Sequence, residues 1–253
     1  MKSLDIQGHI NYSIRINIVT VQLAEWIWAT VCKTVYVGSI PALDSKTPKV
    51  YNMIHMSGPK LSKDIFVACS GGVDSMAVVD FLSKKHNVTV AFFHHGNDDN
   101  SSECFSFLEK FCKDRKLNMV VGYNHEEKPK HMSMEEFWRT KRYEFLHSLK
   151  GQVVTCHHLD DCIETWIWSS MHGDGKIIPY NYKNVVRPFR TTRKSDFIDW
   201  CQRKDVAWVE DESNVEDNTK TRNYIRNVIM PHVLRVNPGI GKVVRKKVLN
   251  ENL

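Results

Sequence analysis

The sequence lacks the features that mark several common protein classes. Its seven cysteines include no C-x-x-C pair and their number is odd, which argues against a zinc ribbon and against a closed disulfide framework. It also has no long apolar run, because its most apolar stretch, residues 18–40, is interrupted by Gln22, Glu25 and Lys33. No basic segment leads into an apolar core and a cleavage site, as it would in a secretory signal. We therefore expect a soluble, cytoplasmic protein with no membrane contact.

Low-complexity composition is absent as well. With 12 Gly and 8 Pro among 253 residues, and with 42% hydrophobic and 25% charged residues, the chain is neither collagen-like nor disordered as a whole. This length suffices for one full-size domain, or for one domain with a small appendage. Lys and Arg outnumber Asp and Glu by 35 to 29, for a net charge of +6, which suits a polyanionic partner without proving one.

Short apolar runs alternate with segments of helical periodicity from about residue 64 onward. We expect strands at 65–69, 88–93, 119–123 and 152–156, with helices at 73–85, 101–116, 133–149 and 160–171 between and after them. Such alternation predicts an α/β fold with a parallel, twisted sheet and helices on both of its faces. Beyond residue 173 we expect a loop or hairpin at 177–186 and then a small helical C-terminal segment, with helices at 194–204 and 223–234.

A glycine-rich turn follows the first expected strand directly. Two adjacent glycines let the backbone approach a ligand closely, and the amides of the turn and of the next helix form a nest for an anion. A plain tight turn needs the glycines but not the serines and the aspartate around them, and Asp74 is a candidate ligand for a metal ion that bridges phosphates. The motif has no Gly-Lys-Ser/Thr ending, so a Walker A loop is disfavoured. The cofactor-binding residues that we predict are Ser70, Gly71, Gly72, Val73, Asp74 and Ser75.

Three carboxylates and two imidazoles lie within nine residues, from His157 to Thr165, at the end of the fourth expected strand. Such groups are costly to bury without partners. Asp161 and Glu164 are three residues apart and share one face of a helix, where they can bind magnesium or an ammonium group. The alternative is a helix N-terminus with solvated acids. In a parallel sheet this segment and the glycine-rich turn meet at the same edge, where ligands bind.

The residues from 218 to 250 contain no acidic side chain but many basic ones. A solvated basic surface and a contact with a phosphate backbone explain this charge equally well. The basic residues are Lys220, Arg222, Arg226, Arg235, Lys242, Arg245, Lys246 and Lys247.

The glycine-rich turn resembles the PP-loop of the ATP pyrophosphatase family, whose S-G-G-x-D-S pattern it matches at every fixed position. The resemblance implies the adenine-nucleotide α-hydrolase-like PP-loop fold. Enzymes of that family cleave ATP between the α and β phosphates, and their loop binds the leaving pyrophosphate. They adenylate a carbonyl oxygen, and a nucleophile then displaces AMP.

Four further segments resemble the tRNA(Ile)-lysidine synthetases within that family. Residues 157–165 are similar to H-H-x-D-D-Q-x-E-T, with Cys162 in place of Gln, and residues 136–143 to E-x-x-A-R-x-x-R-Y, with Trp138 at the small position. Residues 172–175 are similar to R-G-x-G, with His172 for Arg, and residues 187–231 follow R-P-L…E-D-x-S-N…R-N-x-I-R…P. The resemblance runs from about residue 64 to residue 231.

This resemblance implies a two-step reaction on the wobble cytidine of an isoleucine tRNA with a CAU anticodon. ATP adenylates the C2 oxygen of the base, and the ε-amine of free L-lysine then displaces AMP to give lysidine. ATP and Mg²⁺ are the implied cofactors. Each of the four arginines that are candidates for contacts with ATP or the tRNA backbone could instead form an ordinary surface salt bridge. The implied catalytic residues are Asp74, Asp161 and Glu164, and Asp74 is also the implied metal ligand. The implied substrate-binding residues are His157, Asp160, Arg139, Arg142, Arg222 and Arg226.

Two departures from the family pattern leave alternatives open. After the second expected strand the chain reads His-Gly-Asn-Asp at 95–98, where the family has H-G-L-R, and it ends 22 residues after Pro231, without the C-terminal domains of larger members. The alternatives are another PP-loop ligase that modifies tRNA or nucleotides, and a degenerate PP-loop protein that binds tRNA without activity. A homodimer is also left open.

We divide the chain into a poorly ordered or spurious leader (1–55), a PP-loop core (56–175), the remainder of the catalytic domain (176–235) and a basic tail (236–253). Residues 1–52 match nothing in the family. Residues 38–41 can be encoded by the T-loop sequence of tRNA genes, and residues 30–35 by a stem and loop like an anticodon arm. We therefore predict that this leader is a tRNA gene read as protein, with the true start at Met53 or Met56; the alternative is a genuine, loosely folded extension.

Overall fold

Six strands form one sheet in the computed structural model, which describes residues 53–96, 99–210 and 221–251. The strand order is β3-β2-β1-β4-β6-β5, and every neighbouring pair is parallel except β5 and β6, which form an antiparallel hairpin. Residues 1–52 of the predicted leader lie outside the described residues. The strands are β1 (Asp64–Ala68), β2 (Asn87–His94), β3 (Asn118–Tyr123), β4 (Gln152–Val154), β5 (Asn181–Tyr182) and β6 (Val185–Val186).

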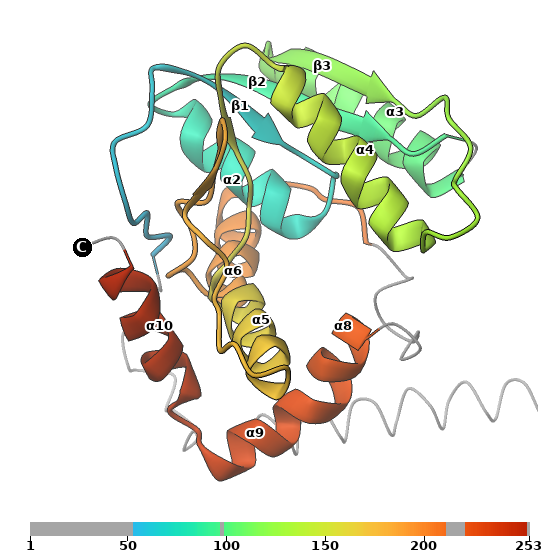
Figure 1. The fold of residues 1–253 in the computed structure, drawn as a ribbon. Coiled ribbons are helices and arrows are strands. Elements are labelled where there is room, and N and C mark those ends of the chain that lie inside the picture. Colours follow the sequence, from blue (N-terminus) through green and yellow to red (C-terminus); the bar gives the residue numbers. More distant parts are fainter. Residues whose placement is uncertain (1–52, 97–98, 211–220, 252–253) are drawn as a thin grey trace, which may run out of the picture. The chain divides into compact units, whose positions relative to one another are not determined.

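Helices cover both faces of this sheet, as predicted (Figure 1). Alternation along β1 explains how one strand serves two layers, since successive side chains of a strand point to opposite faces. Ile65 and Val67 join the core cluster that contains residues of α2, α3 and α6, whereas Phe66 and Ala68 pack in the cluster with Leu146 of α4. The helices after the first four strands are α2 (Val73–Ser83), α3 (Asp99–Arg115), α4 (Met134–Ser148) and α5 (Leu159–Met171), and α6 (Lys194–Lys204) follows the hairpin.

Capping groups in the sequence fix where two of these helices begin. The side chain of Ser133 accepts a hydrogen bond from the backbone N–H of Glu136 at 3.2 Å, and α4 begins directly after it. At α5 the cap is His158, which exchanges hydrogen bonds with Asp161 three residues later. Both helices therefore begin within a residue or two of their predicted positions.

The C-terminal part is more helical than the sequence predicts. Residues 221–251 contain four helical pieces: α8 (Thr221–Tyr224), the π-helical turn η1 (Ile225–Ile229), α9 (Met230–Val236) and α10 (Ile240–Asn250). The region predicted only as a basic tail thus contains α10, whose apolar residues pack against α5. Among the described residues, no helix is long and apolar enough to cross a membrane.

The segment before β1 is joined to the rest of this unit by residues far along the chain. Ile54 is buried in the main core cluster, and the backbone N–H of His55 donates to Thr192 Oγ1 at 3.0 Å. The hydroxyl of Thr192 in turn donates to the carbonyl oxygen of His55 at 2.6 Å. The last two residues assigned to the leader, Ile54 and His55, are thus part of the fold.

Candidate active site

The glycine-rich turn lies between the end of β1 and the start of α2. Gly71 has a φ of +88°, a conformation that side chains rarely adopt, and its carbonyl accepts a hydrogen bond from the Val209 N–H at 2.9 Å. The Ser75 hydroxyl closes the turn, since it accepts from the Ser70 N–H at 3.3 Å and donates to the Gly72 carbonyl at 2.8 Å. Gly72 is the N-cap of α2 and offers no side-chain cap, so the first amides of this helix suit an anionic ligand.

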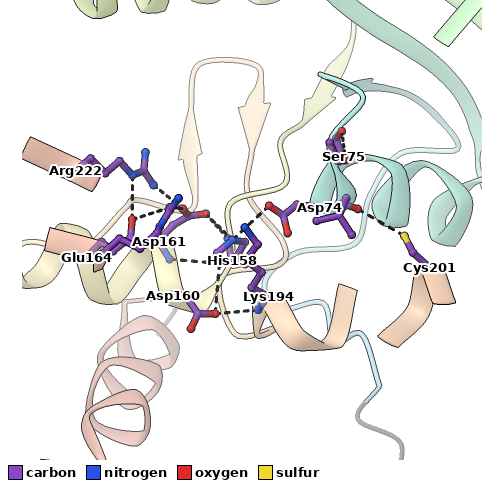
Figure 2. A network of polar contacts seen from close by, with 12 residues as sticks. Asp74, Ser75, His158, Asp160, Asp161, Glu164, Lys194, Cys201 and Arg222 are labelled. Carbon is purple, nitrogen blue, oxygen red and sulfur yellow. Dashed lines mark hydrogen bonds and ion pairs between the residues drawn. The ribbon is translucent and has the colours of Figure 1, made fainter. Parts of the chain in front are cut away.

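Asp74, in the first turn of α2, points toward the N-terminus of α5 (Figure 2). Its Oδ2 lies 3.6 Å from Nε2 of His158, whereas its Oδ1 is buried and has no hydrogen-bond partner among the described residues. A buried carboxylate oxygen of this kind is costly, and a hard cation satisfies it. No group of three or more metal-ligating side chains occurs in the described part of the chain, so a magnesium ion here would take most of its ligands from phosphates and water.

His158 connects the glycine-rich turn to the carboxylates of α5. Its ring lies 3.6 Å from Asp74 and 3.5 Å from each of Asp160 and Asp161. Burial lowers the pKa of His158, but the carboxylates of Asp161, Asp74 and Asp160 outweigh it and raise the pKa to about 8. These carboxylates therefore favour the cationic form of the ring, in which Nδ1 carries a proton and no longer accepts the Asp161 N–H.

The other charges of this cluster come from two arginines near the C-terminal end of the described chain. Arg222 of α8 contacts Asp161 Oδ1 at 2.5 Å and Glu164 Oε2 at 3.0 Å, and Arg226 of η1 donates to both oxygens of Glu164 at 2.7 and 3.1 Å. Burial raises the pKa of Asp161, but His158 and Arg222 oppose it and hold the pKa well below its usual range. The two arginines gain higher pKa values from the same carboxylates, against the effect of burial.

A cavity of about 680 Å³ lies beside this cluster, between α4, α5 and the segment before β6. Burial lowers the pKa of His157 to about 3, so its ring is neutral, and its Nδ1 lies 2.9 Å from the Thr155 hydroxyl. Polar groups therefore surround a space large enough for a nucleoside or an amino acid. The lining residues are Glu136, Arg139, Thr140, Tyr143, Glu144, His147, His157, Thr165, Ile177, Ile178, Pro179, Tyr182, Lys183, Arg187 and Arg222.

Most of the predicted site residues come together, although they lie far apart in the sequence. Asp74, Asp161, Glu164, Arg222 and Arg226 belong to one chain of ion pairs through His158. His157 and Arg139 line the cavity. The roles of these residues in catalysis and binding stay predictions.

Asp160, which also lies 3.5 Å from His158, and Arg142 were predicted to bind substrate but are not among the residues that line the cavity. Asp160 accepts a hydrogen bond from the backbone N–H of Lys194 at 2.9 Å and thereby holds the start of α6 beside α5. Arg142 does not line the cavity, and its pKa is lowered first by burial and then by the nearby charges of Arg139 and Arg222.

Three residues without a predicted role complete this region. The first is His158, and two imidazoles among three carboxylates are the signal in the sequence that one of them is an internal counter-charge. Arg187 lines the cavity and donates to the Tyr143 hydroxyl at 3.0 Å. Arg187 and Tyr143 both lie in segments that resemble family motifs, and this position is the signal that could have identified them.

The departures from the family motifs fall mostly outside this cluster. Cys162 is fully buried in the cluster that joins α5 and α10, so its side chain packs in the core. Trp138 packs on the His95 ring with a centroid distance of 5.0 Å, and His172 packs on Trp168 at the end of α5. The replaced residues thus serve packing rather than the ion-pair chain.

A family model described as a PP-loop domain matches residues 45–233. The chain is 26% identical to the tRNA(Ile)-lysidine synthase of Haemophilus ducreyi, over 72% of its own length and 45% of that relative. It is 29% identical to the same enzyme of Thermotoga maritima, over 73% and 48%, and 30% identical to that of Enterococcus faecalis, over 69% and 41%. The chain therefore spans less than half of the length of these curated relatives.

A solved structure shares the fold at low sequence identity. It is the U34-tRNA thiolase NcsA from Methanococcus maripaludis with its [4Fe-4S] cluster, at a TM-score of 0.60 and 14% identity, covering 76% of this chain and 74% of the thiolase. This likeness confirms the predicted fold class, a mostly parallel sheet with helices on both faces.

Proposed function

The chain belongs to the PP-loop domain family, and from this premise we propose that it is an ATP-dependent ligase that converts a tRNA cytidine to lysidine. The matched region contains both the glycine-rich turn and the carboxylate cluster. The names of the relatives, which are 26–30% identical, support an isoleucine tRNA as substrate and free L-lysine as the second substrate.

One observation carries this proposal: the ion-pair chain that joins the glycine-rich turn to the cavity. Asp74 contacts His158, His158 contacts Asp161, and Asp161 contacts Arg222, which lines the cavity. The proposed phosphate site and the proposed second substrate site therefore share one ion-pair network at one edge of the sheet, which suits a two-step transfer.

In the first proposed step, the C2 oxygen of the cytidine forms a bond to the α-phosphorus of ATP and pyrophosphate leaves. The amides of the glycine-rich turn and of the first turn of α2 bind the pyrophosphate. Asp74 Oδ1 is the group that would hold Mg²⁺, which neutralises phosphate charge when it is bound. Arg222 is held at the cavity wall by two carboxylates and therefore keeps a fixed position for an anionic substrate.

In the second proposed step, the ε-amine of lysine forms a bond to C2 of the base and AMP leaves. Because its pKa is strongly depressed, Asp161 stays ionised at neutral pH and orients the ammonium group of lysine. The proton that the ammonium group loses passes to solvent and does not stay on Asp161. Glu164 is only 4% exposed and contacts both arginines, so we assign it the role of positioning Arg222 and Arg226.

The experiment that tests this proposal is ATP–pyrophosphate exchange with a tRNA(Ile) transcript that carries a CAU anticodon. We expect exchange that depends on the tRNA and not on lysine, since adenylation precedes lysine attack. Asp74→Asn abolishes it, whereas Asp114→Asn, at an exposed position on α3, leaves it unchanged. Exchange without tRNA would indicate another PP-loop ligase, and tRNA binding without exchange would indicate a degenerate binding protein; either result contradicts the proposal.

A further inference from the structure

Helix α10 has two chemically different faces. Ile240, Gly241, Val244 and Val248 are buried, and they pack against apolar residues of α5 that include Ile163 and Ile167. The ammonium group of Lys247 lies over the Trp166 ring of α5, 5.8 Å from its centroid. The other three basic residues of the helix, Lys242, Arg245 and Lys246, are exposed, and we call them the basic face.

Nothing in the described structure neutralises the basic face. Its three side chains form no ion pair among the described residues, and residues 218–250 contain no acidic side chain. Arg235 of α9 is also exposed and adds a fourth charge in the preceding helix. Like charges three and four residues apart on a helix repel each other, so the basic face lowers helix stability and folding does not account for it.

The packing of α10 fixes the basic face relative to the candidate active site. The partner of α10 is α5, the helix that carries Asp161 and Glu164, and the two lie side by side in Figure 1. The end of α10 is held as well, because the buried guanidinium of Arg190 pairs with Glu251 directly after the helix. A polyanion bound to the basic face is therefore held at a fixed position relative to the carboxylate cluster.

We infer that the basic face of α10 binds the phosphate backbone of the RNA substrate. This inference deepens the proposed function and rests on it. Lysine and arginine side chains on a rigid helix neutralise phosphates without reading bases, and such contacts position an RNA for chemistry elsewhere. An anionic membrane is the less suitable partner, because an interfacial helix buries its apolar face in lipid and that face of α10 is covered by α5.

The test measures the affinity of a fluorescein-labelled tRNA(Ile) transcript by anisotropy between about 50 and about 200 mM KCl. In the triple variant Lys242→Gln, Arg245→Gln and Lys246→Gln, we expect affinity to fall at least about tenfold at the lowest salt. The slope of log K against log salt falls by about 2, because each lost phosphate contact removes about 0.7–0.9. The Michaelis constant for tRNA rises, and kcat at saturating tRNA stays unchanged.

Two further variants make this result specific. The matched control Lys85→Gln, Lys110→Gln and Lys113→Gln removes the same charge from exposed positions outside α10, and we expect wild-type binding. The charge-conserving variant Lys242→Arg, Arg245→Lys and Lys246→Arg keeps every positive charge, and we expect it to bind tRNA with wild-type affinity. Thermal unfolding of each variant shows that the fold persists.

Several outcomes overturn the inference, and they separate it from the proposed function. If the wild type binds and modifies the transcript and the basic-face variant binds equally well, only the inference fails. An equal loss in the matched control shows that net charge alone is responsible, which also refutes a specific face. If the wild type binds vesicles of anionic phosphatidylserine but not tRNA, the inference and the proposed function fail together.

Discussion

Replacing Glu164 by glutamine tests whether the carboxylate cluster is held together as described. Glu164 is 4% exposed and receives one hydrogen bond from Arg222 and two from Arg226. The substitution preserves shape but leaves two guanidinium groups without their shared counter-charge.

Loss of one partner from a fully buried ion pair costs about 3–5 kcal/mol. The side chains of Arg222 and Arg226 are 41% and 31% exposed, so solvent screens part of this effect, and we expect a loss of about 2 kcal/mol. For a domain of this size that loss lowers Tm by roughly 4–8 °C.

The assay is thermal and urea unfolding at neutral pH, with Glu126→Gln as the matched control. Glu126 pairs with Lys141 at 2.7 Å but is 67% exposed, so the same substitution there changes stability by less than about 0.5 kcal/mol. Equal effects of the two substitutions, or no loss in Glu164→Gln, would refute the assignment of Glu164 as the buried centre of the cluster.

Three further predictions concern the groups around this cluster. His158→Asn removes a side chain whose cationic form is stabilised in the fold, because its pKa is raised to about 8. The charge contributes stability fully below about pH 6.5, and this contribution is lost as the pH rises through about 8. The difference in unfolding free energy between variant and wild type should therefore be largest below about pH 6.5 and shrink above about pH 8. Gly71→Ala places a side chain at a φ of +88°, and we expect a loss of about 1–2 kcal/mol in urea unfolding together with weaker ATP binding; normal ATP affinity would contradict this role. Val244→Ala removes buried methyl groups between α10 and α5 and should cost about 2 kcal/mol, whereas Val243→Ala, on the exposed side, should cost little; equal costs would refute the packing of α10.

The sheet and its helices could be predicted because local patterns determine them. The apolar runs at β1, β2 and β3 are continuous or nearly so, as is typical of strands in a parallel sheet, and α6 matches its predicted range at both ends. The segment that forms the short strands β5 and β6 was predicted only as a loop or hairpin, because a strand of two residues is too short to show an alternating hydrophobic pattern.

The partners within the site could not be predicted, because they depend on tertiary contacts. Arg222 lies 58 residues from Glu164 in the sequence, and nothing in either motif indicates that they pair. Helix α10 was missed for a related reason. The spacing of Ile240, Val244 and Val248 is that of one helix face and was an available signal, but the basic residues around them dominated the prediction; their contact with α5 shows what that face packs against. Residues 1–52 of the leader lie outside the described residues, and the predicted origin of this segment stays a prediction.

The most direct test of the proposed function is mass spectrometry of nucleosides from a treated tRNA. The tRNA(Ile) transcript with a CAU anticodon is incubated with the protein, ATP, Mg²⁺ and L-lysine, then digested to nucleosides. We predict a new nucleoside that is heavier than cytidine by one lysine less water and that carries the label of isotopic lysine. If the tRNA is bound and ATP is present but no such nucleoside forms, the assignment of this chain as a lysidine-forming ligase is contradicted.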